Sequence, residues 1–574
     1  MNGPDAPPEA PRAARLRHII LLAVLAAWLT GVRLSESSLI DPDEPRTALV
    51  ARLMAERGDW LAPHLPAVFR HDYPPDPIEG DLLAYWDKPP LYFWLAAGAM
   101  KVLGPTALAA RLPAALSSIL TVLLVYAAGR MLWGERAGFL AGIVMAVAPM
   151  PLAMAHAARM DALLAALMTA MLLAALRLML GMGRPWVWTL ALYVAAGLGI
   201  LTKGLEAVVF PAAAVALAVA LSGRWRDLAR LRPVQGAIVC LAVAAPWFVY
   251  MHLRYPGGAD GQSPGFLYEF FIRQHFSRAG GQIGQKLPPG SLLAVLLAGV
   301  MPWTIFLPAA CARLGRRGWR ERRESPAVLL LLVWSLLIVG CFSFLKTAML
   351  HYVLPAFPPL AILLGGYLAA RLSDGGPDRP FRAALAVATI LGGLVTAGIT
   401  AYLVSKGLWQ QEFLWSIGLA LAVVAAGLLS IIRDRRPAAV SLLVAWLVIV
   451  ATFALVSDPL RIYTEHSTQG ETRIILDAMR PGDEVLAYPY TPYSLAWYLW
   501  PREVRYPASA AAPGEPSCPE LVAALNHPHR TFCMLQKRSV LQAIKGEVRW
   551  PMRVLSTMPD HTLFVTEPQD GRQP

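Results

Sequence analysis

The sequence predicts an all-α polytopic membrane protein with about 13 transmembrane helices and a small C-terminal α/β domain. Three observations lead to this prediction. Of the 574 residues, 56% are hydrophobic and only 16% are charged, and the mean hydropathy is +0.48. Soluble globular proteins carry about 25% charged residues, so this composition argues against one. Long apolar runs then recur along the chain, and this pattern changes near residue 457.

The apolar runs are long enough to cross a bilayer, which takes about 17 to 25 residues of helix. Thirteen runs occur, near residues 16–34, 107–132, 137–155, 160–182, 187–202, 205–222, 234–252, 291–312, 326–345, 350–371, 383–404, 412–432 and 438–456. The first follows Arg12, Arg15 and Arg17, as in a signal peptide, but no small-residue cleavage site is evident. We therefore expect it to be the first span.

The distribution of basic residues predicts an orientation. Lys and Arg outnumber Asp and Glu by 51 to 38, and arginines concentrate in every second loop, for example at 313–323 and 433–436. Short loops rich in Lys and Arg remain in the cytoplasm. The other loops and the C-terminal region then face outward, which in a bacterial inner membrane means the periplasm. Scattered loop arginines do not form the continuous basic face of a nucleic-acid-binding protein.

The predicted domains are a transmembrane domain, 1–456, with a large periplasmic first loop at 35–106, and a periplasmic soluble domain, 457–574. In the latter, short β-like runs at 484–488, 531–535 and 562–565 alternate with helical patterns at 472–479 and 519–525. Cys518 and Cys533 lie in this region and could form a disulfide outside the cytoplasm.

Charged motifs gather in the loops predicted to face outward. Ionisable groups at a membrane boundary are costly unless they face water, a partner or a substrate. Helix capping or snorkelling side chains would explain each motif separately, but their convergence on one face favours a site. The candidate residues are Asp43, Glu44, Arg46, Lys88, Arg159, Asp161, Lys203, Arg278 and Lys346.

An excess of cations in such a site suits phosphate, because arginine pairs with it bidentately and lysine supplies a point charge. A carboxylate among these cations stays ionised and can orient a substrate or accept a hydrogen bond from it. Neighbouring spans rich in Leu, Ala and Val can accommodate a lipid tail. Since the sequence has no Walker-type glycine loop, we expect the activated group to arrive on a lipid phosphate rather than a nucleotide.

The order of the motifs resembles a known family. Asp43-Glu44-Pro45-Arg46 resembles the acidic motif, and Asp87-Lys88-Pro89-Pro90-Leu91 the Glu-Lys-Pro-Pro-Leu motif, of bacterial polyprenyl-phosphate-sugar glycosyltransferases with the GT-C fold. Further matches in order are Ala110–Pro113, Met160-Asp161, Leu201–Gly204 and His351–Pro355. The sequence is most similar to the lipid A 4-amino-4-deoxy-L-arabinose transferases, which are related to protein O-mannosyltransferases. The resemblance covers the whole chain.

This resemblance implies transfer of 4-amino-4-deoxy-L-arabinose from undecaprenyl phosphate to a lipid A phosphate at the periplasmic face, with inversion at the sugar carbon. Such a modification gives polymyxin resistance. Asp43 is implied as the principal catalytic carboxylate, with Glu44 and Asp161 beside it. The implied substrate-binding residues are Arg46, Lys88, Arg159, Lys203, Arg278, Lys346 and Tyr352. No cofactor is required, although Asp87 and His275 match a position at which the family can hold a metal such as zinc.

Some residues depart from the family pattern and leave the sugar and acceptor open. Residues 66–84 look like an insertion, Asp87 replaces Glu, and Leu205 stands where proline is common. One alternative within the class is a transferase that acts on a protein or another envelope glycan. An alternative of another class is a lipid or sugar flippase. A transporter typically carries midspan charges and repeated halves, whereas these motifs lie at one edge and no repeat is visible.

Overall fold

The computed structural model describes residues 12–72, 78–257, 265–277, 287–288, 290–345, 348–373, 379–405, 412–456, 467–488, 492–505, 519–535, 538–558 and 561–568. The chain forms two compact units. The first comprises residues 1–34, 86–95 and 111–457, and the second comprises residues 35–85, 96–110 and 458–574. Most of the predicted first loop therefore belongs to the same unit as the C-terminal region.

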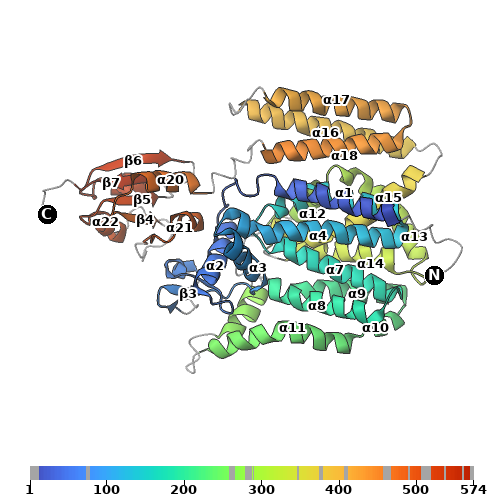
Figure 1. Cartoon of the computed structure of the whole chain (residues 1–574), viewed down its shortest axis with the longest axis horizontal. Helices are drawn as coiled ribbons and strands as arrows, with labels where there is room; N and C mark the ends of the chain where they lie inside the picture. Colours follow the sequence, from blue (N-terminus) through green and yellow to red (C-terminus); the bar gives the residue numbers. More distant parts are fainter. Residues whose placement is uncertain are drawn as a thin grey trace. The chain divides into compact units, whose positions relative to one another are not determined.

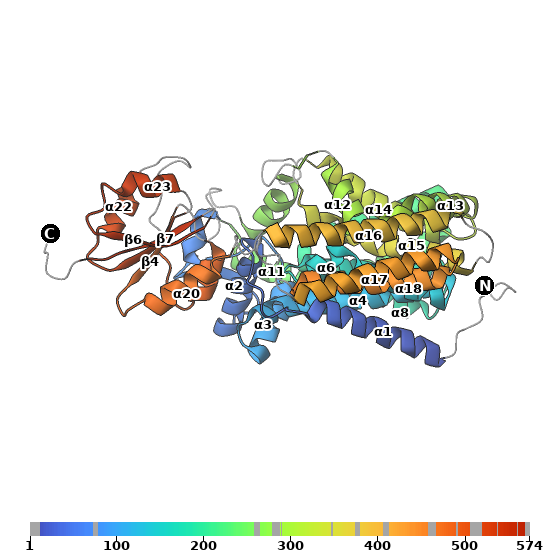
Figure 2. The ribbon, with the colours of Figure 1, turned by 90° about the horizontal axis from the view of Figure 1, so that it is seen from above.

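The first unit is made of helices, most of which run side by side (Figures 1 and 2). Two helices, α3 (Leu91–Leu103) and α4 (Ala107–Trp133), have residues in both units. The others are α1 (Arg12–Gly31), α5 (Glu135–Val147), α6 (Pro149–Ala155), α7 (Asp161–Met179), α8 (Pro185–Lys203), α9 (Glu206–Ser222), α10 (Arg226–Arg230), α11 (Pro233–Arg254), the π-helix η2 (Tyr268–Ser277), α12 (Ser291–Gly299), the 3-10 helix η3 (Trp303–Phe306), α13 (Leu307–Arg320), α14 (Ala327–Phe344), the 3-10 helix η4 (Leu350–Ala356), α15 (Phe357–Ser373), α16 (Arg379–Ser405), α17 (Glu412–Ile432) and α18 (Arg436–Val456).

The apolar helices identify a multi-pass membrane protein. Within the described residues, seven helices are long and apolar enough to cross a bilayer, or nine if two bent pairs each count as one span. Every one of the 13 predicted ranges contains a helix or a broken pair, while the number of spans stays a prediction. Two of the predicted ranges, 137–155 and 291–312, hold bent helix pairs. The chain bends by 63° between α5 and α6, where Pro149 cannot donate a helical hydrogen bond, and by 104° between α12 and the helices from Trp303.

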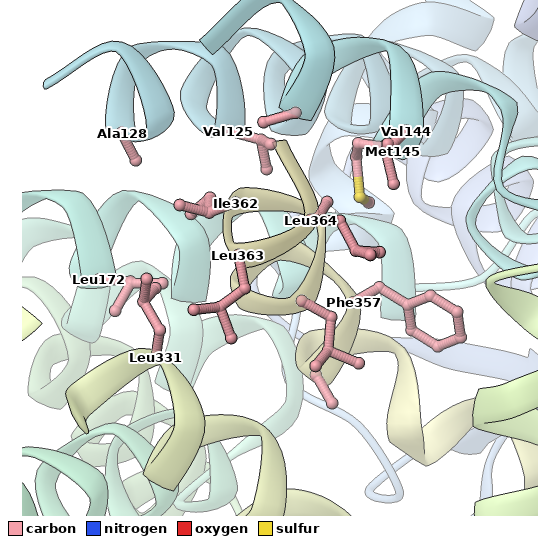
Figure 3. Close-up of a cluster of buried hydrophobic side chains, with 14 of the residues drawn as sticks. Val125, Ala128, Val144, Met145, Leu172, Leu331, Phe357, Ile362, Leu363 and Leu364 are labelled. Atoms are coloured by element: carbon pink, nitrogen blue, oxygen red, sulfur yellow. The ribbon is translucent and has the colours of Figure 1, made fainter. Parts of the chain in front are cut away.

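Small residues let the central helix α15 pack closely against α5. A Cβ atom at Gly365 would lie 2.5 Å from the Ala137 carbonyl oxygen and 2.6 Å from the Ala141 Cβ. Such close approach is typical of membrane helices, because van der Waals packing rather than water exclusion holds them together. Around α15, apolar side chains from α4, α5, α7 and α14 form the core (Figure 3), and the labelled residues include Val125, Met145, Leu172, Leu331 and Leu363.

The second unit contains two sheets. The insertion-like segment forms β1 (His64–Pro66), the 3-10 helix η1 (Ala67–Asp72), β2 (Ile78–Glu79) and β3 (Leu82–Ala84), with antiparallel order β1-β3-β2. Towards the C-terminus, β4 (Glu484–Tyr488), β5 (Thr531–Leu535), β6 (Met552–Thr557) and β7 (Thr562–Thr566) form a sheet of order β4-β5-β7-β6. Strands β4 and β5 are parallel, and the other pairs are antiparallel.

Apolar clusters cover both faces of the four-stranded sheet. One includes Ile475 and Leu495, from α20 (Gln469–Ala478) and α21 (Tyr493–Leu499). The other includes Leu521 and Ile544, from α22 (Pro519–Leu525) and α23 (Arg538–Ile544). Buried β4, β5 and β7 match the β-like runs of the sequence. The sequence did not reveal β6, because this edge strand is largely exposed and lacks a clear apolar alternation.

Residues of the first loop pack against α21 within the second unit. The rings of Phe69 and Tyr493 stack with their centres 4.2 Å apart. Helix α2 (Asp43–Arg57) contributes Arg52, whose guanidinium lies 5.3 Å from the Trp497 ring centre. Before α2, the amide of Leu39 donates to the Tyr498 hydroxyl over 2.8 Å. The insertion-like segment and α2 thus share a folded unit with residues more than 400 positions later.

Candidate active site

The acidic motif forms the first turn of α2, where carboxylates are favoured by the helix dipole. Arg46 donates to the Asp43 carboxylate one turn away. The Arg46 guanidinium also lies 5.7 Å from the centre of the Tyr493 ring. Glu44 is 4% exposed and accepts a 3.0 Å hydrogen bond from the Ile40 amide. Asp43 and Arg46 are therefore the more accessible pair of this motif, while Glu44 holds the preceding loop.

Asp41, just before this motif, binds α21. Its carboxylate accepts hydrogen bonds from the Ser494 amide, over 3.0 Å, and from the Ser494 hydroxyl. Burial raises the pKa of Asp41 from its ordinary value to about 7, although these hydrogen bonds and the charge of His561 lower it. Asp41 consequently connects the loop that carries Asp43 to the C-terminal part of the second unit.

Five residues of the first unit form a buried ionic cluster. Asp161, the first residue of α7, lies 2.8 Å from the Lys203 ammonium at the end of α8. Its other oxygen lies 3.5 Å from His351 Nε2 and 3.8 Å from Arg159 Nε. Lys203 also lies 3.2 Å from Glu206. The side chains of Asp161 and Lys203 are each 7% exposed, and buried charges of this kind persist only when paired.

Tyr352 completes this cluster, because the Lys203 ammonium lies 4.1 Å from the centre of its ring. A pocket beside them is lined by Tyr352 and by every member of the cluster except Arg159, together with apolar residues such as Phe342 and Pro355. Its volume of about 10 Å³ has room for about one water molecule. Arg159 and Glu206, at 22% side-chain exposure each, are the members of the cluster that are open to solvent. Arg159 and Glu206 thus face the solvent, while the Asp161 and Lys203 pair beneath them is buried.

A third group surrounds the Asp87-Lys88 motif. Asp87 is 8% exposed and accepts a hydrogen bond from the side-chain amide Nε2 of Gln274, a residue of η2. Burial raises the pKa of the neighbouring Glu269, and the charge of Asp87 adds to this effect while Arg273, 2.9 Å away, opposes it. Lys88 is half-buried beside them in the chain. The motif therefore packs on the loop after α11.

No group of three His, Cys, Asp or Glu side chains that could hold a metal occurs within the described part of the chain. Asp87 uses one oxygen for Gln274, and the side chain of its predicted partner, His275, lies outside the described residues. Arg278 and Lys346 lie outside them as well. The zinc site stays a prediction, and no catalytic step is assigned to it.

The structure brings some of the candidate residues together and adds others. Arg159, Asp161, Lys203 and Tyr352 lie in one cluster, as the motif order suggests. Sequence reasoning did not select Glu206 or His351. The signal was present for both, since His351 opens the His-Tyr-Val-Leu-Pro motif and Glu206 follows Lys203 at the i,i+3 spacing of helix neighbours.

Comparison with known proteins places the chain in a family. The model of the dolichyl-phosphate-mannose-protein mannosyltransferase family matches residues 87–250. An undecaprenyl phosphate-alpha-4-amino-4-deoxy-L-arabinose arabinosyl transferase of Aeromonas salmonicida is 30% identical, over 68% of each chain. The chain belongs to this transferase family. The resemblance inferred from the motifs is thereby confirmed.

Other members of the family are similar to this chain at comparable sequence identity. The Pseudomonas aeruginosa transferase of strain LESB58 is 29% identical over 452 residues, which are 76% of this chain and 75% of that protein. A Pectobacterium carotovorum transferase is 31% identical over 373 residues. Here the match spans 64% of this chain and only 62% of the relative's length.

Solved structures support the fold of 96% of the chain. The crystal structure of ArnT from Cupriavidus metallidurans bound to undecaprenyl phosphate matches with a TM-score of 0.76 at 22% identity. The match covers 96% of this chain and 99% of that one. An archaeal oligosaccharyltransferase from Archaeoglobus fulgidus in the apo form matches more distantly, with a TM-score of 0.51 and 12% identity over 95% of this chain and 70% of that one. The chain thus has the helical GT-C fold expected from its motifs.

Proposed function

We propose that this protein transfers 4-amino-4-deoxy-L-arabinose from undecaprenyl phosphate to a phosphate group of lipid A. The observation that carries this proposal is membership of a family whose named members are aminoarabinose transferases. In support of it, the partly exposed Arg159 lies beside the buried Asp161 and Lys203 pair, at one end of membrane-spanning helices, and its guanidinium is suited to phosphate. We further propose that this end faces the periplasm and that the membrane is the bacterial inner membrane.

The reaction requires one displacement at the sugar. An anionic phosphate oxygen of the acceptor attacks the anomeric carbon, and the bond from this carbon to the undecaprenyl phosphate oxygen breaks. The electron pair of that bond remains on the leaving undecaprenyl phosphate, and configuration inverts. Because the acceptor is already ionised, no strong general base is needed. Cations that neutralise the leaving phosphate then provide most of the stabilisation.

The residues divide between contact and positioning roles in this proposal. Asp43 orients the acceptor or the sugar, and Arg46, which is paired with this carboxylate, holds it in position. Lys88 and Arg159 bind donor phosphate, with Arg278 and Lys346 proposed from their motifs alone. The remaining pair, Asp161 and Lys203, is too buried to be freely available to a substrate, so it acts by positioning Arg159 and Tyr352.

An assay with purified protein tests this function. Detergent-solubilised protein would be mixed with undecaprenyl phosphate aminoarabinose and Kdo2-lipid A, and products would be measured by mass spectrometry. We expect one aminosugar to be added, and Asp43→Asn to reduce the rate at least 100-fold. The matched control is Asp81→Asn, which changes an exposed, arginine-paired carboxylate in the same loop and should retain activity.

The same assay separates the alternatives. Transfer to a protein or another glycan, but not to lipid A, would refute the acceptor proposed here while preserving the class of reaction. Absence of transfer to every acceptor, with movement of the lipid-linked sugar across liposomes, would instead identify a flippase.

A further inference from the structure

A second polar pocket lies at the opposite end of the helices that hold Asp161 and Lys203. It is lined by Arg177 and Leu178 near the end of α7, the turn at Gly181–Pro185, and Arg230 and Arg232 around the end of α10, and its volume is about 370 Å³. Asp161 and Arg177 are 16 residues apart on α7, which corresponds to about 24 Å along the helix axis. In Figure 1, α10 lies at one end of α8, α9 and α11. The pocket is therefore separate from the candidate active site.

Positive charge in this pocket is only partly neutralised. The buried Asp227 pairs with Arg224 over 2.7 Å and with Arg230 over 3.0 Å. Arg177 stacks on the Trp188 ring, 4.7 Å from its centre, and its Nε atom has no hydrogen-bond partner among the described residues. Three arginines, Arg177, Arg230 and Arg232, line the pocket, and Arg230 is paired with Asp227. This excess of positive charge attracts an anion.

Two arginines, Arg230 in the pocket and Arg224 on the same carboxylate, are held in place by backbone carbonyl oxygens. Arg230 donates to the Met179 carbonyl oxygen over 2.9 Å, and Arg224 donates to the Glu324 carbonyl oxygen over 2.6 Å. Guanidinium groups oriented in this way lose little conformational freedom when they pair with a phosphate. The pocket is consequently preorganised for an anionic group.

The apolar residues around the pocket indicate that the anion belongs to a lipid. Leu178, Met182 and Pro185 line the pocket together with the arginines. Trp186, which follows Pro185 in the chain, and Trp225, which precedes α10, are 59% and 62% exposed, as expected for tryptophans at the level of lipid headgroups. Basic pockets between membrane helices bind headgroups of anionic lipids. We propose that this pocket binds the phosphodiester headgroup of an anionic membrane phospholipid.

Native mass spectrometry of the full chain tests this site. The probes are cardiolipin, phosphatidylglycerol and phosphatidylethanolamine with the same acyl chains, and inorganic phosphate. We expect the two anionic lipids to bind at least tenfold more tightly than phosphatidylethanolamine. Equal retention of the three lipids would overturn the proposal, and this comparison needs no variant. Displacement of the lipids by inorganic phosphate would assign the pocket to a free anion and would also overturn it.

Arginine variants test whether the anionic lipid binds in this pocket. Arg232→Asn keeps a residue that tolerates the left-handed backbone at φ 51°, and removing one arginine should weaken anionic lipid binding about fivefold. Adding Arg230→Gln should weaken it at least tenfold. The control Arg226→Gln, an exposed arginine of α10 outside the pocket, should bind like the wild type. An equal loss in this control would refute the site, and thermal unfolding would verify that each variant is folded.

Discussion

At the residue scale, the Asp161 and Lys203 pair illustrates how a buried charge depends on its partner. Removing one member of a buried pair typically costs about 3–5 kcal/mol, because the other charge is left uncompensated. We expect Lys203→Met to lower thermal stability by this amount and the double variant Asp161→Leu with Lys203→Met to recover part of it. Thermal unfolding in detergent measures both.

Measuring transfer activity in the same variants shows whether the Asp161 and Lys203 pair positions other residues for the reaction or only stabilises the fold. The double variant should remain inactive, because Arg159 and Tyr352 lose the groups that orient them. Recovery of full activity together with stability would show that the pair has no role in the reaction.

Another residue-scale prediction concerns pH. The pKa of Asp41 rises from 3.8 to about 7 on folding, so the folded protein binds this proton more tightly than the unfolded chain. Its contribution to stability is present below about pH 4 and is lost as pH rises to about 7. We expect Asp41→Asn to remove this part of the pH dependence, measured by thermal unfolding between pH 4 and 8. The exposed control Asp477→Asn should keep the wild-type slope.

At the scale of elements, contact between α15 and α5 depends on glycine. A methyl group at Gly365 would meet the Ala137 carbonyl oxygen at 2.5 Å, and a backbone atom cannot move aside as a flexible side chain does. We expect Gly365→Ala to destabilise the protein by about 1–3 kcal/mol. In contrast, Gly340→Ala on α14 meets nothing within 4 Å and should be neutral or stabilising. Equal effects in thermal unfolding would contradict this explanation.

At the scale of the whole molecule, α2 and the C-terminal residues form one folded unit. A chain that ends at residue 456 lacks Tyr493 and Ser494, which contact Arg46 and Asp41. We expect hydrogen exchange of residues 43–57 to become at least tenfold faster in this truncated protein, while α15 remains protected. Unchanged protection of α2 would show that this helix does not need the C-terminal region.

Local patterns allowed much of this architecture to be predicted. The length of an apolar run determines whether a helix can span a bilayer, so all 13 predicted ranges contain helices. The convergence of charged motifs on one face likewise predicted that Asp161 and Lys203 belong together, and the family resemblance added Tyr352. The break at residue 148 was not predicted from the apolar run, although Pro149 and Pro151 mark it in the sequence.

The sequence by itself thus determined the membrane class, the helix ranges and the family, since composition, periodicity and motifs are properties of neighbouring residues. Only the tertiary structure revealed which distant segments meet. Pairing of Asp161 with His351 and stacking of Phe69 on Tyr493 depend on the path of the chain between them. The same holds for Arg177 and Arg232, which are 55 positions apart in the sequence and line one pocket. Contacts of this kind have no local signature, because packing alone brings their residues together.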